Sequence, residues 1–320
     1  MTSASVLAAA AVALVGLAPT YPVFLCAWLL VGVASAGTFY PPAFAALTHW
    51  FGTGRVRAIT ILTLVAGFAS TIFAPLTAAL GEELGWRGTY LVFAGLLLAV
   101  TVPAHALTLA LPWVPDGSPA HARADRDILL SRTFLLLAAS GTLAALAMYA
   151  SLVNLVPLLF DRGLGLHLAA WALGLSGAGQ VAGRLLYPTL DRRLATHTRA
   201  AAVIAVMAGT LAALALVPGP ALLVLAIAAL GGAARGLFTL VGATVVADHW
   251  GAERYAALNG VYHAPIGIAA ALAPALGTGL ASLTGSYAAL FGVLAAVAVV
   301  AALLATLSGG PTDRSRPDEL

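Results

Sequence analysis

Two arginines lie inside long apolar runs of this sequence. Arg235 stands in GGAARGLFTL, 13 residues before Asp248, and Arg184 stands seven residues before Asp191. An ionised side chain at the centre of a bilayer costs at least about 2.5–3.5 kcal/mol, so such residues usually face a cavity or a partner. A guanidinium can hold a carboxylate through two parallel hydrogen bonds. These positions predict binding of a small anion. The alternative is an arginine held by backbone carbonyls or by neighbouring acids.

Other polar side chains in the apolar runs are candidates to line the same path. They are Gln180, Asn154, Tyr149, Tyr40 and His263. Gln180 is one helical turn from Arg184, and a histidine such as His263 can carry a proton. Each of them, taken alone, is also typical of a hydrogen bond between helices. Acidic residues stand only near the ends of the runs, so a cavity built from these segments is basic and favours an anion.

The elements that position these residues are membrane-spanning helices. The chain is 61% hydrophobic and only 8% charged, with a mean hydropathy of +0.99. Runs of about 20 apolar residues span a bilayer as helices, whereas barrel strands alternate over about ten residues. We therefore predict an all-α polytopic membrane protein. Its ten apolar segments are expected at 3–18, 22–47, 58–80, 88–110, 133–159, 167–190, 200–217, 221–246, 256–282 and 287–307.

The arginines between the segments indicate orientation. Alternate connections carry eleven arginines, whereas the opposite connections carry only Arg87 and Arg162. The excess of positive charge faces the cytoplasm in helical membrane proteins. We therefore expect a multi-pass protein of the bacterial cytoplasmic membrane, with its C-terminus in the cytoplasm. The basic pI reflects these loops and does not indicate a nucleic-acid partner.

The two halves of the chain repeat each other. His49-Trp50 matches His249-Trp250 at an offset of 200, and Gly85 matches Gly285 at the same offset. Six segments separate the matching ones, so the repeating unit has six helices. The C-terminal unit is complete, whereas the N-terminal unit shows four segments. We therefore expect a twelve-span design of which ten spans are present, the first two preceding Met1.

Several stretches resemble the major facilitator superfamily of secondary transporters. HWFGTGRVRAITILTLVAGFASTIFAPL followed by LGWR, and the later APALGTGLASLTGSY, are similar to its monocarboxylate and oxalate/formate branch. The resemblance implies two helix bundles around a central cavity that opens alternately to either side. It divides the chain into an incomplete N-terminal bundle (1–110), a central cytoplasmic loop (111–132), a C-terminal bundle (133–307) and a cytoplasmic tail (308–320).

GRLLYPTLDRR, residues 183–193, resembles the loop signature that braces the cytoplasmic gate in this superfamily. Tyr187 replaces the glycine that is usual four residues before the aspartate. The resemblance assigns Asp191, Arg192 and Arg193 to the gate, and the first copy of this loop would lie before Met1. We group Arg55 and Arg57 with the gate residues because they stand in another cytoplasmic turn, HWFGTGRVRA.

These observations predict a secondary transporter of a small organic anion, with a proton or a counter-substrate as possible partner and the lipid bilayer as surroundings. The alternatives are efflux of a neutral or hydrophobic compound, or a remnant that does not transport. An enzyme would need a catalytic set near a membrane face, such as paired acids, a histidine cluster or an activated serine, and the sequence shows no metal-ligand spacing and no phosphate loop. We expect no catalytic residue, metal or cofactor.

Overall fold

The computed structural model describes residues 1–67, 69–108 and 125–309. The chain divides into an N-terminal unit, Met1–Ala120, and a C-terminal unit, His121–Leu320. The described part of each unit is helical throughout. Seven helical stretches of the described chain are long and apolar enough to cross a membrane. The predicted all-α membrane architecture is therefore confirmed, while residues 109–124 of the predicted central loop and 310–320 of the tail lie outside the described residues.

The N-terminal unit is built around the contacts of its first helix with the second and the fifth. The chain folds there into α1 (Thr2–Leu17), α2 (Tyr21–Ala36), α3 (Tyr40–Phe51), η1 (Gly52–Gly54), α4 (Arg55–Gly67), α5 (Ala69–Leu96), a π-helical turn η2 (Leu97–Thr101) and α6 (Val102–Thr108). A partly buried Ser5–His105 contact, 2.6 Å between Oγ and Nδ1, joins α1 to α6.

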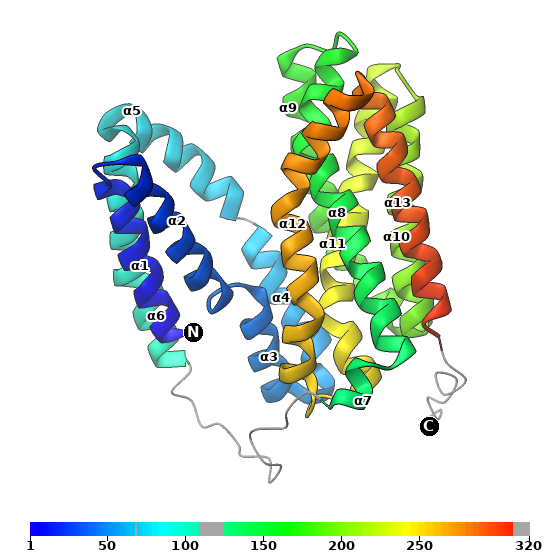
Figure 1. Cartoon of the computed structure of the whole chain (residues 1–320), viewed down its shortest axis with the longest axis horizontal. Helices are drawn as coiled ribbons and strands as arrows, with labels where there is room; N and C mark the ends of the chain where they lie inside the picture. Colours follow the sequence, from blue (N-terminus) through cyan, green and yellow to red (C-terminus); the bar gives the residue numbers. More distant parts are fainter. Residues whose placement is uncertain (68, 109–124, 310–320) are drawn as a thin grey trace. The chain divides into compact units, whose positions relative to one another are not determined.

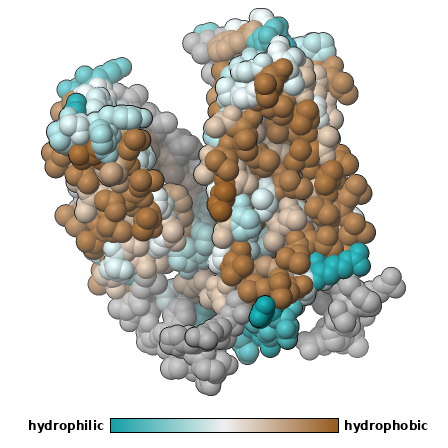
Figure 2. All heavy atoms as spheres, in the orientation of Figure 1, coloured by the Kyte–Doolittle hydropathy of each residue, from teal (hydrophilic) through white to brown (hydrophobic). Residues whose placement is uncertain are grey.

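The C-terminal unit is a bundle of six long helices after one short one (Figure 1). These are α7 (Arg126–Leu129), α8 (Arg132–Asp161), α9 (Leu166–Arg193), α10 (Thr196–Leu216), α11 (Ala221–Trp250), α12 (Tyr255–Thr284) and α13 (Tyr287–Leu307). The main packing pairs are α9 with α11, α10 with α13, and α8 with both α12 and α13. Apolar side chains cover the middle of this unit in Figure 2, and polar ones gather toward its ends, as a bilayer requires.

One predicted segment is divided between two helices within the described residues. Within segment 22–47, α2 ends at Ala36 and α3 begins at Tyr40, which Pro41 and Pro42 follow directly. Proline has no N–H to donate, so it is tolerated in the first turn of a helix and breaks one elsewhere. The sequence analysis missed this break because apolar residues continue across it.

Positive φ recurs at glycines that match between the two halves of the sequence. Gly52 and Gly251, which follow the two His-Trp pairs, have φ of 47° and 82°, and Gly85 and Gly285 have φ of 66° and 65°. Non-glycine residues rarely adopt positive φ because Cβ approaches the following carbonyl. The ψ angles differ within each pair, −111° and 164° for the first and 173° and 14° for the second, so the turns share the need for glycine but not one conformation.

Two arginines lie in the connections that are otherwise poor in arginine, and each of them binds the backbone of a neighbouring turn. Arg87 donates from Nη2 to the Ala18 carbonyl at 3.1 Å, between α1 and α2. Arg162 donates from Nη1 to the Val217 carbonyl at 2.8 Å, between α10 and α11. Each guanidinium thus satisfies backbone groups that the end of a helix leaves free, so a local structural requirement explains both exceptions to the charge asymmetry.

Replacing Gly285 by Ala should lower the stability of the C-terminal unit by about 1–2 kcal/mol, because alanine resists positive φ. Gly279→Ala, in the same helix and with open space around a Cβ, is the matched control and should be neutral or stabilising. Thermal unfolding of the detergent-solubilised protein measures both. Equal midpoints for the two variants would contradict the structural role of this glycine.

Candidate functional site

Arg235 lies near the middle of the 30-residue helix α11, about 20 Å from either end at 1.5 Å per residue. Its Nη2 donates a hydrogen bond of 2.6 Å to Oγ of Ser176, which is 4% exposed on α9. The Nε of Arg235 is buried and has no hydrogen-bond partner among the described residues. The guanidinium is therefore held in place but not fully paired.

A close helix crossing brings Ser176 within reach of Arg235. Gly179 and Gly183 on α9 face Gly232 and Gly236 on α11. A Cβ added to any of these four glycines would lie between 1.9 and 2.2 Å from a carbonyl oxygen of the opposite helix. Small residues four apart are the pattern that lets membrane helices pack backbone against backbone. The sequence analysis did not use these two Gly-x-x-x-Gly pairs, although both are plain in the sequence.

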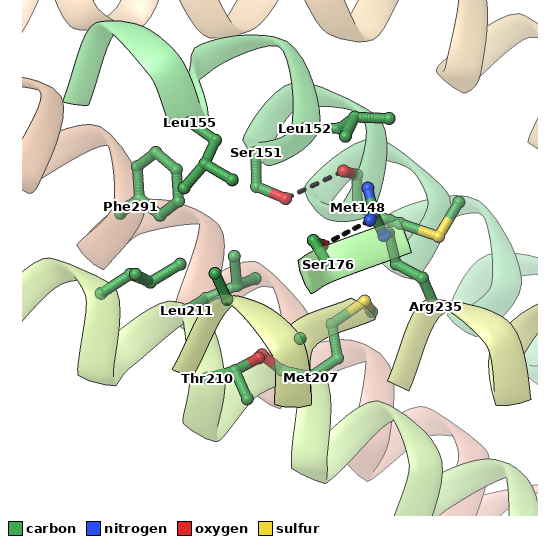
Figure 3. A pocket seen from close by; sticks show the side chains of 13 residues that line it. Met148, Ser151, Leu152, Leu155, Ser176, Met207, Thr210, Leu211, Arg235 and Phe291 are labelled. Carbon is green, nitrogen blue, oxygen red and sulfur yellow. Dashed lines mark hydrogen bonds between the residues drawn. The ribbon is translucent and has the colours of Figure 1, made fainter. Parts of the chain in front are cut away.

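A cavity of about 40 Å³ lies beside this contact (Figure 3). Side chains from five helices of the C-terminal unit line it, and apart from one arginine and three hydroxyls they are apolar or glycine. The hydroxyls of Ser151 and Thr210 donate to carbonyls of their own helices, at Met148 and Met207. Ser176 instead accepts its hydrogen bond from Arg235, as the dashed line in Figure 3 shows.

The other predicted binding residues lie in different surroundings. Tyr149 is 39% exposed on α8, next in sequence to Met148, which lines the cavity together with Arg235. Gln180 is half-buried one turn after Ser176, and Arg184 is buried one turn further along α9. The structure thus gathers Arg235 and Tyr149 at one place, with Gln180 and Arg184 continuing along α9.

Asn154, His263 and Tyr40 have local partners. The Nδ2 of buried Asn154 donates to the Ala150 carbonyl at 2.9 Å. His263 on α12 places Nδ1 3.1 Å from the carbonyl oxygen of Asn259. Tyr40, in the N-terminal unit, stacks on Phe44 with ring centroids 5.0 Å apart. These contacts are of the packing type, and a binding role for the three residues stays a prediction.

The predicted gate residue Asp191 belongs to a buried charge cluster. The cluster lies at the end of the C-terminal unit that carries Arg192, Arg193, Arg199 and Arg254, which we call the arginine-rich end. Arg199 on α10 is 1% exposed and donates to Asp191 at 2.6 Å and to Asp248 at 2.5 Å. The ring of buried Tyr187 lies 5.3 Å from the guanidinium carbon of Arg199. One arginine thus joins the ends of α9, α10 and α11, and Tyr187 contributes an aromatic face where the loop signature has glycine.

The remaining predicted gate residues have other surroundings, and two of them belong to the N-terminal unit. Arg192 and Arg193 are exposed at the end of α9, and Arg57 is exposed on α4. Arg55 donates to the Gly52 carbonyl at 3.3 Å. Sequence reasoning missed Arg199 and Asp248 as partners because it treated both as residues of helix ends. No group of three or more His, Cys, Asp or Glu side chains gathers within the described residues as a metal site would require.

Comparison with known proteins identifies relatives in one family. The sequence profile of the Major Facilitator Superfamily matches residues 1–229. Monocarboxylate transporter 11 of Homo sapiens is 31% identical over 49% of this chain and 34% of its own length. The Mus musculus protein of the same name is 30% identical over 72% of this chain and 47% of its own length. The matches therefore span half of these relatives' length or less.

A bacterial relative and a solved structure cover more of the chain. The protein named transcription regulatory protein OpdE of Pseudomonas aeruginosa is 28% identical over 92% of this chain and 73% of its own length. The fucose:proton symporter FucP of E. coli superposes with a TM-score of 0.75, over 97% of this chain and 82% of that one, at 14% identity. The latter likeness concerns the fold alone.

Replacing Gly232 by Ala should destabilise the protein by about 1–3 kcal/mol, because its Cβ would lie 1.9 Å from the Ser176 carbonyl oxygen and force α9 away from α11. Gly209→Ala on α10, where a Cβ meets nothing within 4 Å, is the matched control. Thermal unfolding compares the two. A Gly232→Ala protein as stable as Gly209→Ala would show that the crossing is looser than described.

Removing the guanidinium of Arg199 should cost about 3–5 kcal/mol, since Asp191 and Asp248 would lose their shared counter-charge. Arg199→Gln is therefore expected to lower the unfolding midpoint strongly, or to prevent accumulation of folded protein. Arg254→Gln, at an exposed arginine, serves as the control and should behave as wild type. A wild-type midpoint for Arg199→Gln would rule out a bracing role for the cluster.

Proposed function

The chain belongs to the major facilitator superfamily, and from that premise we propose that it is a secondary transporter of small organic anions that works by alternating access. The single observation that carries the substrate class is Arg235, a cation in mid-helix that is not fully paired. A carboxylate can take two parallel hydrogen bonds from a guanidinium. We assign Arg235 as the residue that binds the carboxylate of the substrate.

The acidic residues of the C-terminal unit support this assignment. Asp191 and Asp248 pair with Arg199 at the arginine-rich end. Asp161 and Glu253 are exposed at the ends of helices, as are Asp125 and Asp127 before α8. No described acid of this unit therefore pairs with Arg235. Because a buried charge is costly unless it is paired, an incoming carboxylate gains more at this position than a cation or a neutral solute would.

The names of the two mammalian relatives refer to monocarboxylate transport, which agrees with a carboxylate substrate. We assign supporting roles to Tyr149, Gln180 and Arg184, which lie near Arg235 or further along α9. Asn154, Tyr40 and His263 are assigned to the same path as polar lining, with His263 as a site for a coupled proton. A counter-substrate is the alternative to a proton.

One observation favours a second candidate function. Arg235 already donates to Ser176, and the cavity beside it is mostly apolar. An arginine held in this way is compatible with efflux of a neutral or hydrophobic compound in which Arg235 only stabilises the bundle. The two functions differ in whether binding of the transported solute requires Arg235. A carboxylate substrate requires it, whereas a neutral compound does not.

The protein is a multi-pass membrane protein, and we propose that its arginine-rich end faces the cytoplasm of a bacterium. In that orientation Asp191, Arg199 and Asp248 lie at the cytoplasmic end of the C-terminal unit, where a gate would close. Arg192, Arg193, Arg55 and Arg57 would then stand where anionic headgroups are found.

Replacing Arg235 by Ala should lower carboxylate uptake about 10- to 100-fold, the effect of losing a charged hydrogen bond worth about 1.5–3 kcal/mol. Arg235→Lys should keep part of the activity because it keeps the charge but not the fork of donors. Uptake of labelled short-chain carboxylates into proteoliposomes measures both. Arg126→Ala, at an exposed arginine outside the spans, is the control.

If folded Arg235→Ala protein takes up carboxylates at the wild-type rate, Arg235 has no role in binding. If wild-type protein takes up no carboxylate but a library of neutral compounds identifies an exported solute, the efflux function replaces the proposal.

A further inference from the structure

The cavity beside Arg235 is too small for an extended organic molecule. Its volume is about 40 Å³, whereas a single buried water needs roughly 10–15 Å³ of such space. The cavity therefore has room for one small ion or a few waters. Its apolar walls come from methionine, leucine and phenylalanine side chains, which offer water few partners.

The polar groups of the cavity are mainly hydrogen-bond donors. Arg235 lines the cavity with the outer part of its guanidinium, because its Nε is buried without accessible surface. The Ser176 hydroxyl accepts from Arg235, so its own hydrogen remains available to donate. The hydroxyls of Ser151 and Thr210, by contrast, already donate to carbonyls of their own helices. A positive charge and a free hydroxyl in an otherwise apolar cavity suit an anion without large polar surface.

We propose that this cavity binds a chloride ion between the guanidinium of Arg235 and the hydroxyl of Ser176, and that the ion is the counter-charge of Arg235. A monatomic anion fits the volume, accepts from both donors and needs no further polar partner. The site does not depend on transport, although a substrate carboxylate would compete with the ion for the same guanidinium. Water would fill the space without neutralising the charge.

The test measures thermal unfolding of the purified protein in detergent at constant ionic strength, with isethionate replaced stepwise by chloride or bromide. A ligand that binds only the folded state raises the midpoint as its concentration passes its dissociation constant. We expect a saturable rise of about 5 °C with either halide. Isethionate is an organic sulfonate without a carboxylate, is too large for the cavity and should give no rise.

Three variants test whether the halide-dependent rise in the unfolding midpoint arises at the proposed site. Arg235→Gln should abolish the halide-dependent rise, and Ser176→Ala should reduce it by at least half. Ser282→Ala removes an exposed hydroxyl that bonds its own helix on α12, and it should keep the full rise. If Arg235→Gln does not fold, the comparison of Ser176→Ala with Ser282→Ala decides the question.

Equal midpoints of wild-type protein in chloride and isethionate, or an undiminished halide effect in Arg235→Gln or Ser176→Ala, would overturn the chloride site. Carboxylate uptake in chloride-free isethionate buffer separates this result from the proposed function. Carboxylate uptake with no effect of halide on the unfolding midpoint would contradict only the chloride site. A halide effect on the midpoint with no carboxylate uptake would contradict only the transport proposal.

Discussion

The cost of burying a positive charge in an apolar helix bundle governs the surroundings of Arg235. Removing an ion from water costs several kcal/mol even after the protein has relaxed around it. One hydrogen bond to a charged group returns about 1.5–3 kcal/mol. The single bond to Ser176 therefore leaves the guanidinium incompletely compensated. It also requires the close crossing of α9 and α11, so the four glycines that allow this approach are part of the site.

Arg199 meets the same constraint in a different way. It is more deeply buried than Arg235, but two carboxylates and the face of Tyr187 surround it. Its charge is thus more than balanced within the protein, and nothing further is needed to stabilise it. The contrast between the two arginines distinguishes a structural brace from a position that is ready for a ligand. The distinction rests on the partners that each side chain finds and not on depth alone.

Sequence reasoning identified Arg235 because a charge in an apolar run is rare and conspicuous. It did not identify Ser176, because serine is common in membrane helices and usually bonds to its own backbone. The partners of Arg199 were missed because Asp248 is 49 residues away in the sequence, and only the fold brings it near. The two Gly-x-x-x-Gly pairs could have been recognised, and they would have predicted the α9–α11 contact. Helix ends were predicted well where glycine or charge marks them, and poorly where apolar residues continue through a break.

The repeat explains why only one half of the chain carries a charge at this position. The two halves share their turn glycines, and Gly37 and Phe39 match Gly236 and Phe238. Pro41 and Pro42, however, stand where the second half has Leu240 and Val241. The proline pair starts a new helix in the first half, whereas α11 continues unbroken for 30 residues. The residue before the shared glycine is Ala36 in the first half, where it ends α2. In the second half it is Arg235, which lies in mid-helix. A guanidinium at this position is therefore buried in mid-helix in the half whose helix continues.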